Sequence, residues 1–337
     1  MIMKKAHFLC LFVSLALLSC NDNKKHIASA ATGEINHISV IIDDQLWNGE
    51  VGDSIRNKFA SAVIGLPQEE PLFTINQYPV KLLEGFMTNS RNIIVVKREP
   101  KSNFRIVCNE FAKPQNVIHI TGRNVEEIIN ILEKRTPEII KRMKDTEIHE
   151  AQRRIDTSLL NSERIRSMFS ASLHIPASYK YAVVSDNFLW LKREIISGNT
   201  SILIYQVPIS YLDNKSVAES IINMRDSIGA LYIKGMQPDT EMVSERAYAP
   251  YIATVTLNGR KTYETRGTWE LKNDFMSGPF VNFAIIDEAQ NRVLVVEGFC
   301  YAPSKNKRDL MHELEAIIRT IKFTKDAGSA EVGNKAF

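Results

Sequence analysis

Two adjacent carboxylates, Asp43 and Asp44, follow the β-branched run of residues 38–42, and Trp47 comes three residues later. Carboxylates at the end of a strand could bind a cation or act together as acid and base. Neighbouring strand residues point to opposite faces, however, so this pair would not easily share one ion or one proton. Turn formation is the alternative interpretation, because aspartate favours turns.

A second group, Arg266, Trp269 and Glu270, falls within a predicted strand of residues 262–271. In regular strand geometry Arg266 and Glu270 face one side of a sheet and Trp269 faces the other. Such a mixture of charged and aromatic side chains could bind a glycan or a peptide. The alternative is that Trp269 belongs to the core and the charges pair on a solvated face.

Two further reactive side chains, Cys108 and Cys300, lie in apolar runs typical of strands. A disulfide between them is compatible with an oxidising compartment, and buried free thiols are the alternative. Their separation in the sequence does not decide between the two.

The motifs of the common enzyme and metal-binding classes are missing from the sequence. Its seven histidines are scattered, and neither His-x-x-x-His nor Cys-x-x-Cys occurs. A Gly-x-Ser-x-Gly turn and a phosphate-binding glycine loop are missing as well. We therefore predict no metal ion, no cofactor and no catalytic residue.

The N-terminus has the zones of a secretory signal over residues 1–19, namely two lysines, an apolar run of residues 6–18 and a small residue at the cut. Its ending, Leu17-Leu18-Ser19-Cys20, resembles the lipobox of bacterial lipoproteins. The resemblance implies cleavage before Cys20 and lipid on that cysteine. Ordinary secretion with a cut after Ala30 is the alternative, because residues 28–30 also form a small-x-small site.

Lipid on Cys20 would make a membrane the first partner of this chain. Residues 20–33 are small and polar, so we predict a flexible tether that keeps the folded part near the bilayer. The mixed charges that follow Cys20 leave open whether the anchor is in the inner or the outer membrane. The predicted localisation is thus the cell envelope.

Charge gives no support for nucleic-acid binding. Removal of the signal takes away two lysines and leaves 40 of the 42 basic side chains against 39 acidic ones. Basic residues do not cluster with aromatic residues. An envelope protein or a glycan is the partner class that we expect besides the membrane.

Hydrophobic periodicity predicts an α+β domain over residues 34–122. Val51, Ile55, Phe59 and Val63 recur every four residues, with Ala62 on the same face, as the apolar stripe of a helix. A short helix opened by Pro79 is expected to turn Leu82, Leu83 and Phe86 inward. Strands are predicted at residues 38–42, 72–78, 93–96, 104–108 and 117–120. This order of elements fits a mixed sheet with a separate helical layer.

Residues 123–166 are predicted to contain a long, charged helix that joins two domains. Asn124 is a suitable N-cap, and 13 of the 24 residues from position 133 to 156 are charged. Pro137 is expected to kink or divide the helix. Because the apolar stripe is narrow, we expect a solvated connector, with a partner-binding helix as the alternative.

A second α+β domain is predicted over residues 167–324, before a disordered tail of residues 325–337. Asn258-Gly259 between alternating runs indicates a hairpin. The predicted strands are residues 172–175, 181–184, 188–192, 202–207, 251–257, 262–271, 281–286 and 292–300, with helices at 217–228 and 310–318. Two helices on such strands suggest an antiparallel sheet with one covered face. The order is loosely similar to the PsbP and Mog1 type of α+β fold, a similarity that carries no activity.

Five stretches occur in an order that resembles a lipoprotein family of Bacteroidota. They are Asp44-Gln45-Leu46-Trp47, Gly65-Leu66-Pro67-Gln68-Glu69-Glu70-Pro71, Arg91-Asn92-Ile93-Ile94-Val95-Val96, Thr265-Arg266-Gly267-Thr268-Trp269-Glu270 and Glu297-Gly298-Phe299-Cys300-Tyr301-Ala302-Pro303. With the lipobox, they make the chain similar to domain of unknown function 4837 over nearly its whole length. The resemblance implies an exported lipoprotein of unassigned activity and supplies no catalytic residues.

The sequence as a whole favours a membrane-tethered binding or assembly module of the cell envelope without enzymatic activity. An envelope hydrolase or glycan-processing enzyme is one alternative, and it would need two carboxylates, or a carboxylate and a histidine, to meet in a deep pocket. A purely structural lipoprotein is the other alternative.

Overall fold

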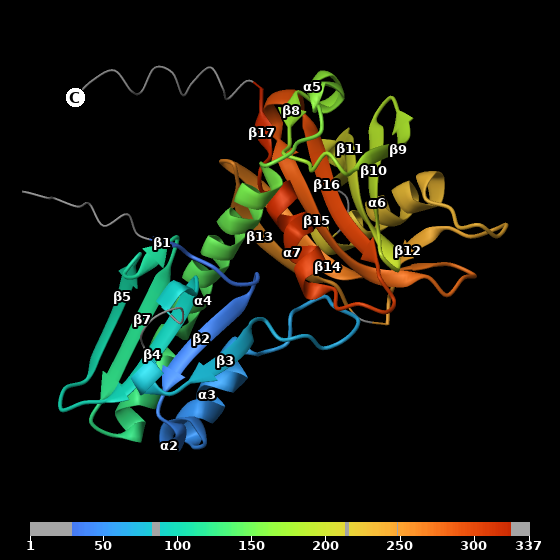
Figure 1. Ribbon diagram of the computed structural model, residues 1–337. Helices are drawn as coiled ribbons and strands as arrows, with labels where there is room; N and C mark the ends of the chain where they lie inside the picture. Colours follow the sequence, from blue (N-terminus) through green and yellow to red (C-terminus); the bar gives the residue numbers. More distant parts are fainter. Residues whose placement is uncertain (1–28, 83–87, 213–215, 248, 325–337) are drawn as a thin grey trace, which may run out of the picture.

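The computed structural model describes residues 29–82, 88–212, 216–247 and 249–324, which form two α+β units (Figure 1). The predicted fold class, two α+β units joined by a long helix, is confirmed. The predicted signal, Cys20 and the tail of residues 325–337 lie outside the described residues. Within the described residues, none of the helices is long and apolar enough to cross a membrane.

The N-terminal unit is built on a mixed sheet in the order β3-β2-β4-β7-β5, in which β5 alone runs antiparallel to its neighbour. Its helices α3 and α4 pack on one face, over a core that includes Ile55, Phe59 and Val96. The elements are β1 (Ser29–Ala30), β2 (His37–Ile42), α2 (Asp44–Trp47), α3 (Glu50–Phe59), β3 (Thr74–Tyr78), η1 (Val80–Leu82), β4 (Asn92–Arg98), β5 (Asn103–Cys108), β6 (Ala112–Lys113), β7 (Asn116–Gly122) and α4 (Val125–Ile155). The predicted mixed sheet with a separate helical layer is thus confirmed.

The C-terminal unit is built on an antiparallel sheet of eight strands in the described residues, in the order β12-β14-β15-β16-β11-β10-β9 with β13 also paired to β14. Its elements are α5 (Glu163–Phe169), β8 (Ala171–Ser172), β9 (Lys180–Ser185), β10 (Phe188–Ile195), β11 (Gly198–Pro208), η3 (Ile209–Leu212), α6 (Val217–Tyr232), β12 (Met242–Ser244), β13 (Tyr251–Leu257), β14 (Arg260–Leu271), β15 (Ser277–Asp287), η4 (Glu288–Gln290), β16 (Arg292–Tyr301), α7 (Arg308–Ile318) and β17 (Lys322–Phe323). The predicted hairpin at Asn258-Gly259 joins β13 to β14.

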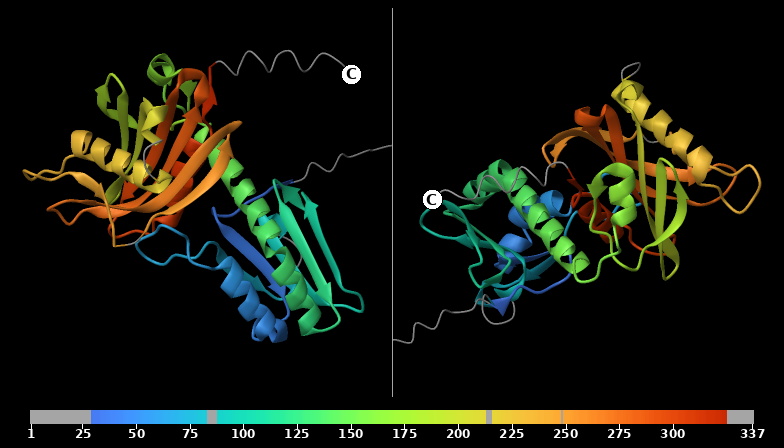
Figure 2. Two further views of the ribbon diagram at one scale, coloured as in Figure 1. Left: turned by 180° about the vertical axis from the view of Figure 1, so that it is seen from behind. Right: turned by 90° about the horizontal axis from the view of Figure 1, so that it is seen from above.

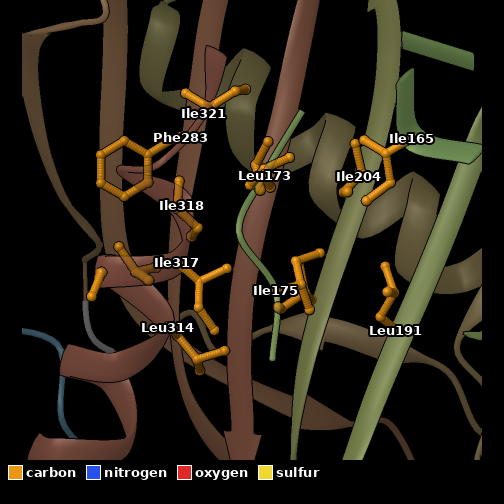
Figure 3. Close-up of a cluster of buried hydrophobic side chains, with 14 of the residues drawn as sticks. Ile165, Leu173, Ile175, Leu191, Ile204, Phe283, Leu314, Ile317, Ile318 and Ile321 are labelled. Atoms are coloured by element: carbon orange, nitrogen blue, oxygen red, sulfur yellow. The ribbon is translucent and has the colours of Figure 1, made fainter. Parts of the chain in front are cut away.

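Both faces of this eight-stranded sheet are covered, which corrects the prediction of one covered face. Helix α7 packs on one face, where its Leu314 and Ile317 belong to the same core as Ile204 and Phe283 of the sheet (Figure 3). Helix α6 lies on the other face, and its Met224 belongs to a separate core (Figure 2). The prediction failed because strands buried on both faces are apolar at nearly every position, and periodicity alone does not assign the second helix to a face.

Helix α4 runs unbroken through both cores and is not a solvated connector. Pro137 lies inside it without dividing it, and the predicted N-cap is confirmed by the bond from the Glu127 amide to Asn124 Oδ1. The first half contributes to the core of the N-terminal unit and the second half to that of the C-terminal unit; the residues are Ile128, Leu132, Ile139 and Met143, and then Ile148, Ala151 and Ile155. The second half of the narrow apolar stripe of α4 is therefore covered by the C-terminal unit of the same chain.

The loop of residues 60–73 extends from the N-terminal unit toward α7 and β14 (Figure 1). Its Glu70 carboxylate accepts hydrogen bonds from the backbone amides of Lys307, at 2.6 Å, and Arg308, at 2.9 Å. Glu70 thus caps the start of α7, where Lys307 supplies no side-chain cap of its own. At Gly65, φ is +85°, and an added Cβ would lie 2.9 Å from the Cβ of Arg266. The loop therefore packs closely against the C-terminal unit.

Four local predictions differ from the structure. The helix predicted to extend to Val63 ends at Phe59, as α3. The strand predicted at residues 172–175 shrinks to β8, and the helix predicted after Pro79 is the single turn η1, in which Leu82 is 44% exposed instead of inward. Residues 83–87 lie outside the described part of the chain. The last part of the predicted tether is wrong, because Ser29 and Ala30 pair with β6, and residues 20–28 lie outside the described residues.

Candidate ligand cavity between the two units

A cavity of about 680 Å³ lies between the two units, beside the middle of α4. Ligand sites often occur at such boundaries and commonly have volumes of about 300–1,000 Å³. Its walls come from the loop after α3, from α4, from β13 and β14, and from α7; they are formed by Ser61, Ala62, Val63, Ile64, Leu72, Pro137, Ile140, Lys141, Lys144, Asp145, Ile148, His149, Gln152, Tyr251, Leu257, Glu264, Arg266, Glu315 and Arg319. Both units thus contribute to one cavity.

One wall of the cavity is a closed ion-pair ring of two arginines and two glutamates from β14 and α7. Arg266 donates to Glu264 at 2.7 Å and to Glu315 at 2.6 Å. Arg319 donates to the remaining oxygens of the same carboxylates, to Glu315 at 2.8 Å and to Glu264 at 3.3 Å. Every carboxylate oxygen of the ring therefore has a guanidinium donor, and the ring is neutral as a whole.

Ion pairing in the ring favours the charged forms of Glu315 and Arg266 although both side chains are largely buried. Burial alone would raise the pKa of Glu315, but the charges of Arg266 and Arg319 hold it at about 2. Burial likewise opposes the charged form of Arg266, and its two glutamates outweigh that effect and raise its pKa. Such a ring is poorly suited to proton transfer, because catalysis near neutral pH needs a group that titrates there.

Lys144 is a charged side chain of the cavity that takes no part in the ion-pair ring. Among the residues that the structure describes, no carboxylate lies within 4.0 Å of its ammonium group and no hydrogen bond reaches it. Burial lowers the pKa of Lys144, while Glu315 and Glu264 act in the opposite direction from a distance. The cavity therefore contains one partly buried ammonium group without a partner.

Part of the cavity lining is apolar and open to solvent. Ile64 of the loop is 58% exposed, and Tyr251 of β13, the cross-strand neighbour of Arg266, is 46% exposed. Ile140 and Leu72 continue the same surface. Exposed apolar side chains beside a charged group are suited to a ligand that carries both an apolar part and an ionic part.

The predicted group at the end of the first strand does not form a site. Asp43 precedes α2, and Asp44 is the first residue of that helix, where its carboxylate accepts a bond from Gln77 at 3.1 Å. Trp47 lies under the guanidinium of Arg56, 4.5 Å from the ring centroid. Groups of three or more metal-ligating side chains are missing from all described ranges. Asp43 and Asp44 thus start a helix, close to the alternative of turn formation.

The second predicted group is divided between the two faces of the sheet. Arg266 joins the ion-pair ring on the α7 side, whereas Trp269 is 2% exposed in the core under α6 and donates to the carbonyl of Cys300 at 3.3 Å. Arg266 pairs with Glu264 and Glu315 instead of Glu270, and burial together with Glu245 raises the pKa of Glu270. The opposite faces predicted for Arg266 and Trp269 are thus borne out, but the three residues do not make one binding surface.

The two cysteines are free and far apart in the fold. Cys108 is exposed on β5 of the N-terminal unit and accepts a bond from Arg142 at 3.0 Å, whereas Cys300 is buried in β16 of the C-terminal unit. A disulfide between them is therefore wrong for this structure, and the buried thiol of Cys300 matches the alternative.

A smaller cavity of about 420 Å³ brings His312 together with two carboxylates, Asp309 and Glu313. Each carboxylate is already held by an arginine: Glu313 receives two bonds of 2.7 Å from Arg193, and Asp309 is bound by Arg308 and has a lowered pKa. Burial also lowers the pKa of His312. Both carboxylates are bound by arginines, and the lowered pKa of Asp309 is the opposite of what a general acid needs, so the cavity gives the hydrolase alternative little support.

Sequence reasoning missed Lys144, Glu264, Glu315 and Arg319. The ring joins residues that are about fifty positions apart, and no motif connects them. A weak signal existed on α4, because Ile140, Lys144 and Ile148 follow one another at four-residue intervals and so share a helix face. A lysine at the centre of an apolar stripe could have been singled out.

Comparison with known proteins gives families of unknown function and distant structural likenesses. No curated protein matches this chain. Among solved structures, the Ran-binding protein Mog1p of Saccharomyces cerevisiae is 10% identical with a TM-score of 0.33, covering 47% of this chain and 92% of that one. Human StAR-related lipid transfer protein 5 is 6% identical with a TM-score of 0.23, covering 55% of this chain and 99% of that one. At these TM-scores the likenesses carry no conclusion about ligands.

Two family models match consecutive parts of the chain. Residues 31–156 match a domain of unknown function, DUF8532, and residues 158–320 match another, DUF4837. Three of the five stretches that suggested DUF4837 thus lie in the part that matches the other model, and the resemblance does not extend over nearly the whole length. The boundary at residue 157 coincides with the end of α4. Residues 158–320, and with them the C-terminal unit, are therefore similar to the DUF4837 family.

Proposed function

We propose that this protein is a membrane-tethered binding module of the cell envelope, without enzymatic activity, that holds its ligand in the cavity between the two units. The observation that carries the proposal is the cavity itself, whose lining includes both an unpartnered Lys144 and the exposed side chains of Ile64 and Tyr251. The carboxylates of the ion-pair ring are already bound by guanidinium groups. The ring therefore suits a binding cavity better than a site of proton transfer.

Contacts at the junction of the two units support the proposal that the cavity is already formed before a ligand binds. Helix α4 belongs to both cores, and Glu70 of the N-terminal unit caps α7 of the C-terminal unit. In addition, the buried carboxylate of Glu147 on α4 accepts bonds from Arg91 and Asn92. A site that is already formed loses less conformational entropy on binding than one that must be assembled.

Lipid on Cys20 would place this cavity close to a bilayer. Eight residues separate Cys20 from Ser29, the first described residue, and they would span at most about 28 Å when fully extended. The proposal therefore names the membrane as a partner through Cys20 and the cell envelope as the location. Mass spectrometry of the N-terminal peptide tests this part: an acylated Cys20 supports it, and an N-terminus at Ala31 would overturn it.

Binding in the cavity is tested by filling it. Ala62 lies on the cavity wall and is exposed, so Ala62→Trp should occupy the space without disturbing a core. Ile196, exposed on the turn between β10 and β11, offers the matched control Ile196→Trp. Each variant is purified from cross-linked envelopes, and the molecules attached to it are identified by mass spectrometry.

We expect the same attached species on the natural chain and on Ile196→Trp, and their loss from Ala62→Trp. Recovery of nothing reproducible on the natural chain, or equal recovery on both variants, would overturn the proposal. A purely structural role predicts a different outcome, namely that any folded surrogate on the same anchor restores the phenotype of a deletion strain.

A further inference from the structure

We propose that the ligand of the cavity is an anionic amphiphile whose charged group pairs with Lys144 while its apolar part lies along Ile64 and Tyr251. This inference rests on the proposed function, because it specifies the ligand chemistry of the same cavity.

The charge balance of the cavity walls is the first step. The ion-pair ring is neutral, with both oxygens of Glu264 and of Glu315 bound. Lys141 is bound to Asp145 at 2.7 Å, one turn apart on α4, and that pair is exposed and neutral as well. Lys144 remains as one formal positive charge that no group of the described chain balances. An anion entering the cavity would complete the balance.

The position of Lys144 is the second step. It lies between Ile140 and Ile148 on one face of α4, is partly buried and lines the cavity. A charge that is partly withdrawn from water gains more from a counterion than an exposed one does. The other unpaired basic side chains of a protein surface lack this enclosure, which is why Lys144 is the expected contact.

The apolar wall is the third step and excludes a purely ionic ligand. Ile64 and Tyr251 come from different units, and both expose large apolar surfaces at the rim of the same cavity. Inorganic phosphate would leave these surfaces in water. An alkyl chain or an aromatic ring beside the anionic group would cover them, and burial of apolar surface contributes about 25 cal/mol per Å².

The experiment uses the full-length protein in its native membrane and two photoreactive probes with the same alkyl chain. One probe is a diazirine-bearing dodecanoate, and the other is the corresponding dodecanol, which lacks the charge. After irradiation, labelled peptides are mapped by mass spectrometry, and labelling of peptides that contain Ile64 or Tyr251 is counted as binding in the cavity. Competition by unlabelled dodecanoate and dodecyl phosphate then shows whether a carboxylate or a phosphate headgroup is preferred.

Lys144→Gln should reduce cavity labelling by the dodecanoate roughly ten- to hundred-fold, as expected for the loss of a charge-assisted contact. Labelling by the dodecanol should be weak and unchanged. Lys134→Gln is the matched control, because Lys134 is exposed on the same helix and is not part of the cavity lining, and it should behave like the natural chain. Lys144→Arg keeps the charge and should retain labelling.

The outcomes separate the two proposals. Equal labelling by both probes, unchanged in Lys144→Gln, would refute the role of Lys144 while leaving a ligand cavity in place. Labelling confined to peptides outside the cavity, and insensitive to Ala62→Trp, would overturn the proposed function together with this inference. The melting temperature of Lys144→Gln shows whether this variant is folded. It should match that of the natural chain, because Lys144 forms no bond.

Discussion

Glu70→Ala should destabilise the contact between the two units, because it removes the cap of α7. The carboxylate binds the amides of Lys307 and Arg308, at 2.6 Å and 2.9 Å, and these amides have no helical partner of their own. An unsatisfied buried amide costs about 1–3 kcal/mol, and the favourable interaction of an anion with a helix start contributes about 0.3–1 kcal/mol. We therefore expect a loss of roughly 2–4 kcal/mol in the free energy of unfolding.

Chemical denaturation followed by circular dichroism measures this loss, and hydrogen exchange locates it. Glu69→Ala is the matched control, since Glu69 is the exposed neighbour with the same side chain, and its effect should stay within about 0.5 kcal/mol. In Glu70→Ala the amides at positions 307 and 308 should exchange faster, whereas those of β4 should keep their protection. If Glu70→Ala and Glu69→Ala behaved alike in both measurements, the interpretation of Glu70 as a helix cap would be refuted.

Three further predictions follow from buried charges and thiols. Arg225→Met leaves Glu297, 3.0 Å away and fully buried, without its cation and should cost about 3–5 kcal/mol in urea unfolding; adding Glu297→Leu should recover most of it, and no recovery would contradict the pairing. Glu315 has a folded pKa of about 2 against an ordinary 4.5, so its contribution to stability is complete above pH 4.5 and is lost as the pH falls toward 2. The acid-induced loss measured in pH-dependent unfolding should therefore shrink in Glu315→Gln, and an unchanged profile would count against the ring. Alkylation of the folded protein should modify Cys108 and spare Cys300, whose pKa burial raises to about 12, and a requirement for reductant would show a disulfide instead.

Local patterns in the sequence predict most strands and helices because each element carries its own periodicity. The apolar stripe of Val51, Ile55 and Phe59 predicts α3, and Asn258-Gly259 predicts the hairpin between β13 and β14. The N-cap at Asn124 is likewise a local event, formed with an amide three residues away. Such signals depend only on residues that are close together in the sequence, so they predict an element without knowledge of the rest of the fold.

Contacts between the two units could not be predicted in this way. The carboxylate of Glu70 binds amides 237 and 238 residues later, and nothing in the loop sequence identifies α7 as its partner. Helix α4 was expected to be solvated because its charged residues outnumber its apolar ones. Several of those charged side chains are paired inside the protein. Glu147, for example, is fully buried and bound by Arg91. The composition of a helix therefore predicts its exposure poorly when it crosses a junction between units.

Replacement of Lys144 should have different effects on stability and on ligand binding. Stability alone would favour an apolar side chain between Ile140 and Ile148, because an ammonium group withdrawn from water without a partner is destabilising. Lys144→Met should therefore keep or raise the free energy of unfolding. If Lys144 binds an anionic ligand, the same variant should lose dodecanoate labelling of the cavity. A residue with a structural role would instead lower stability when it is replaced, so measurement of both quantities on one variant separates the two explanations.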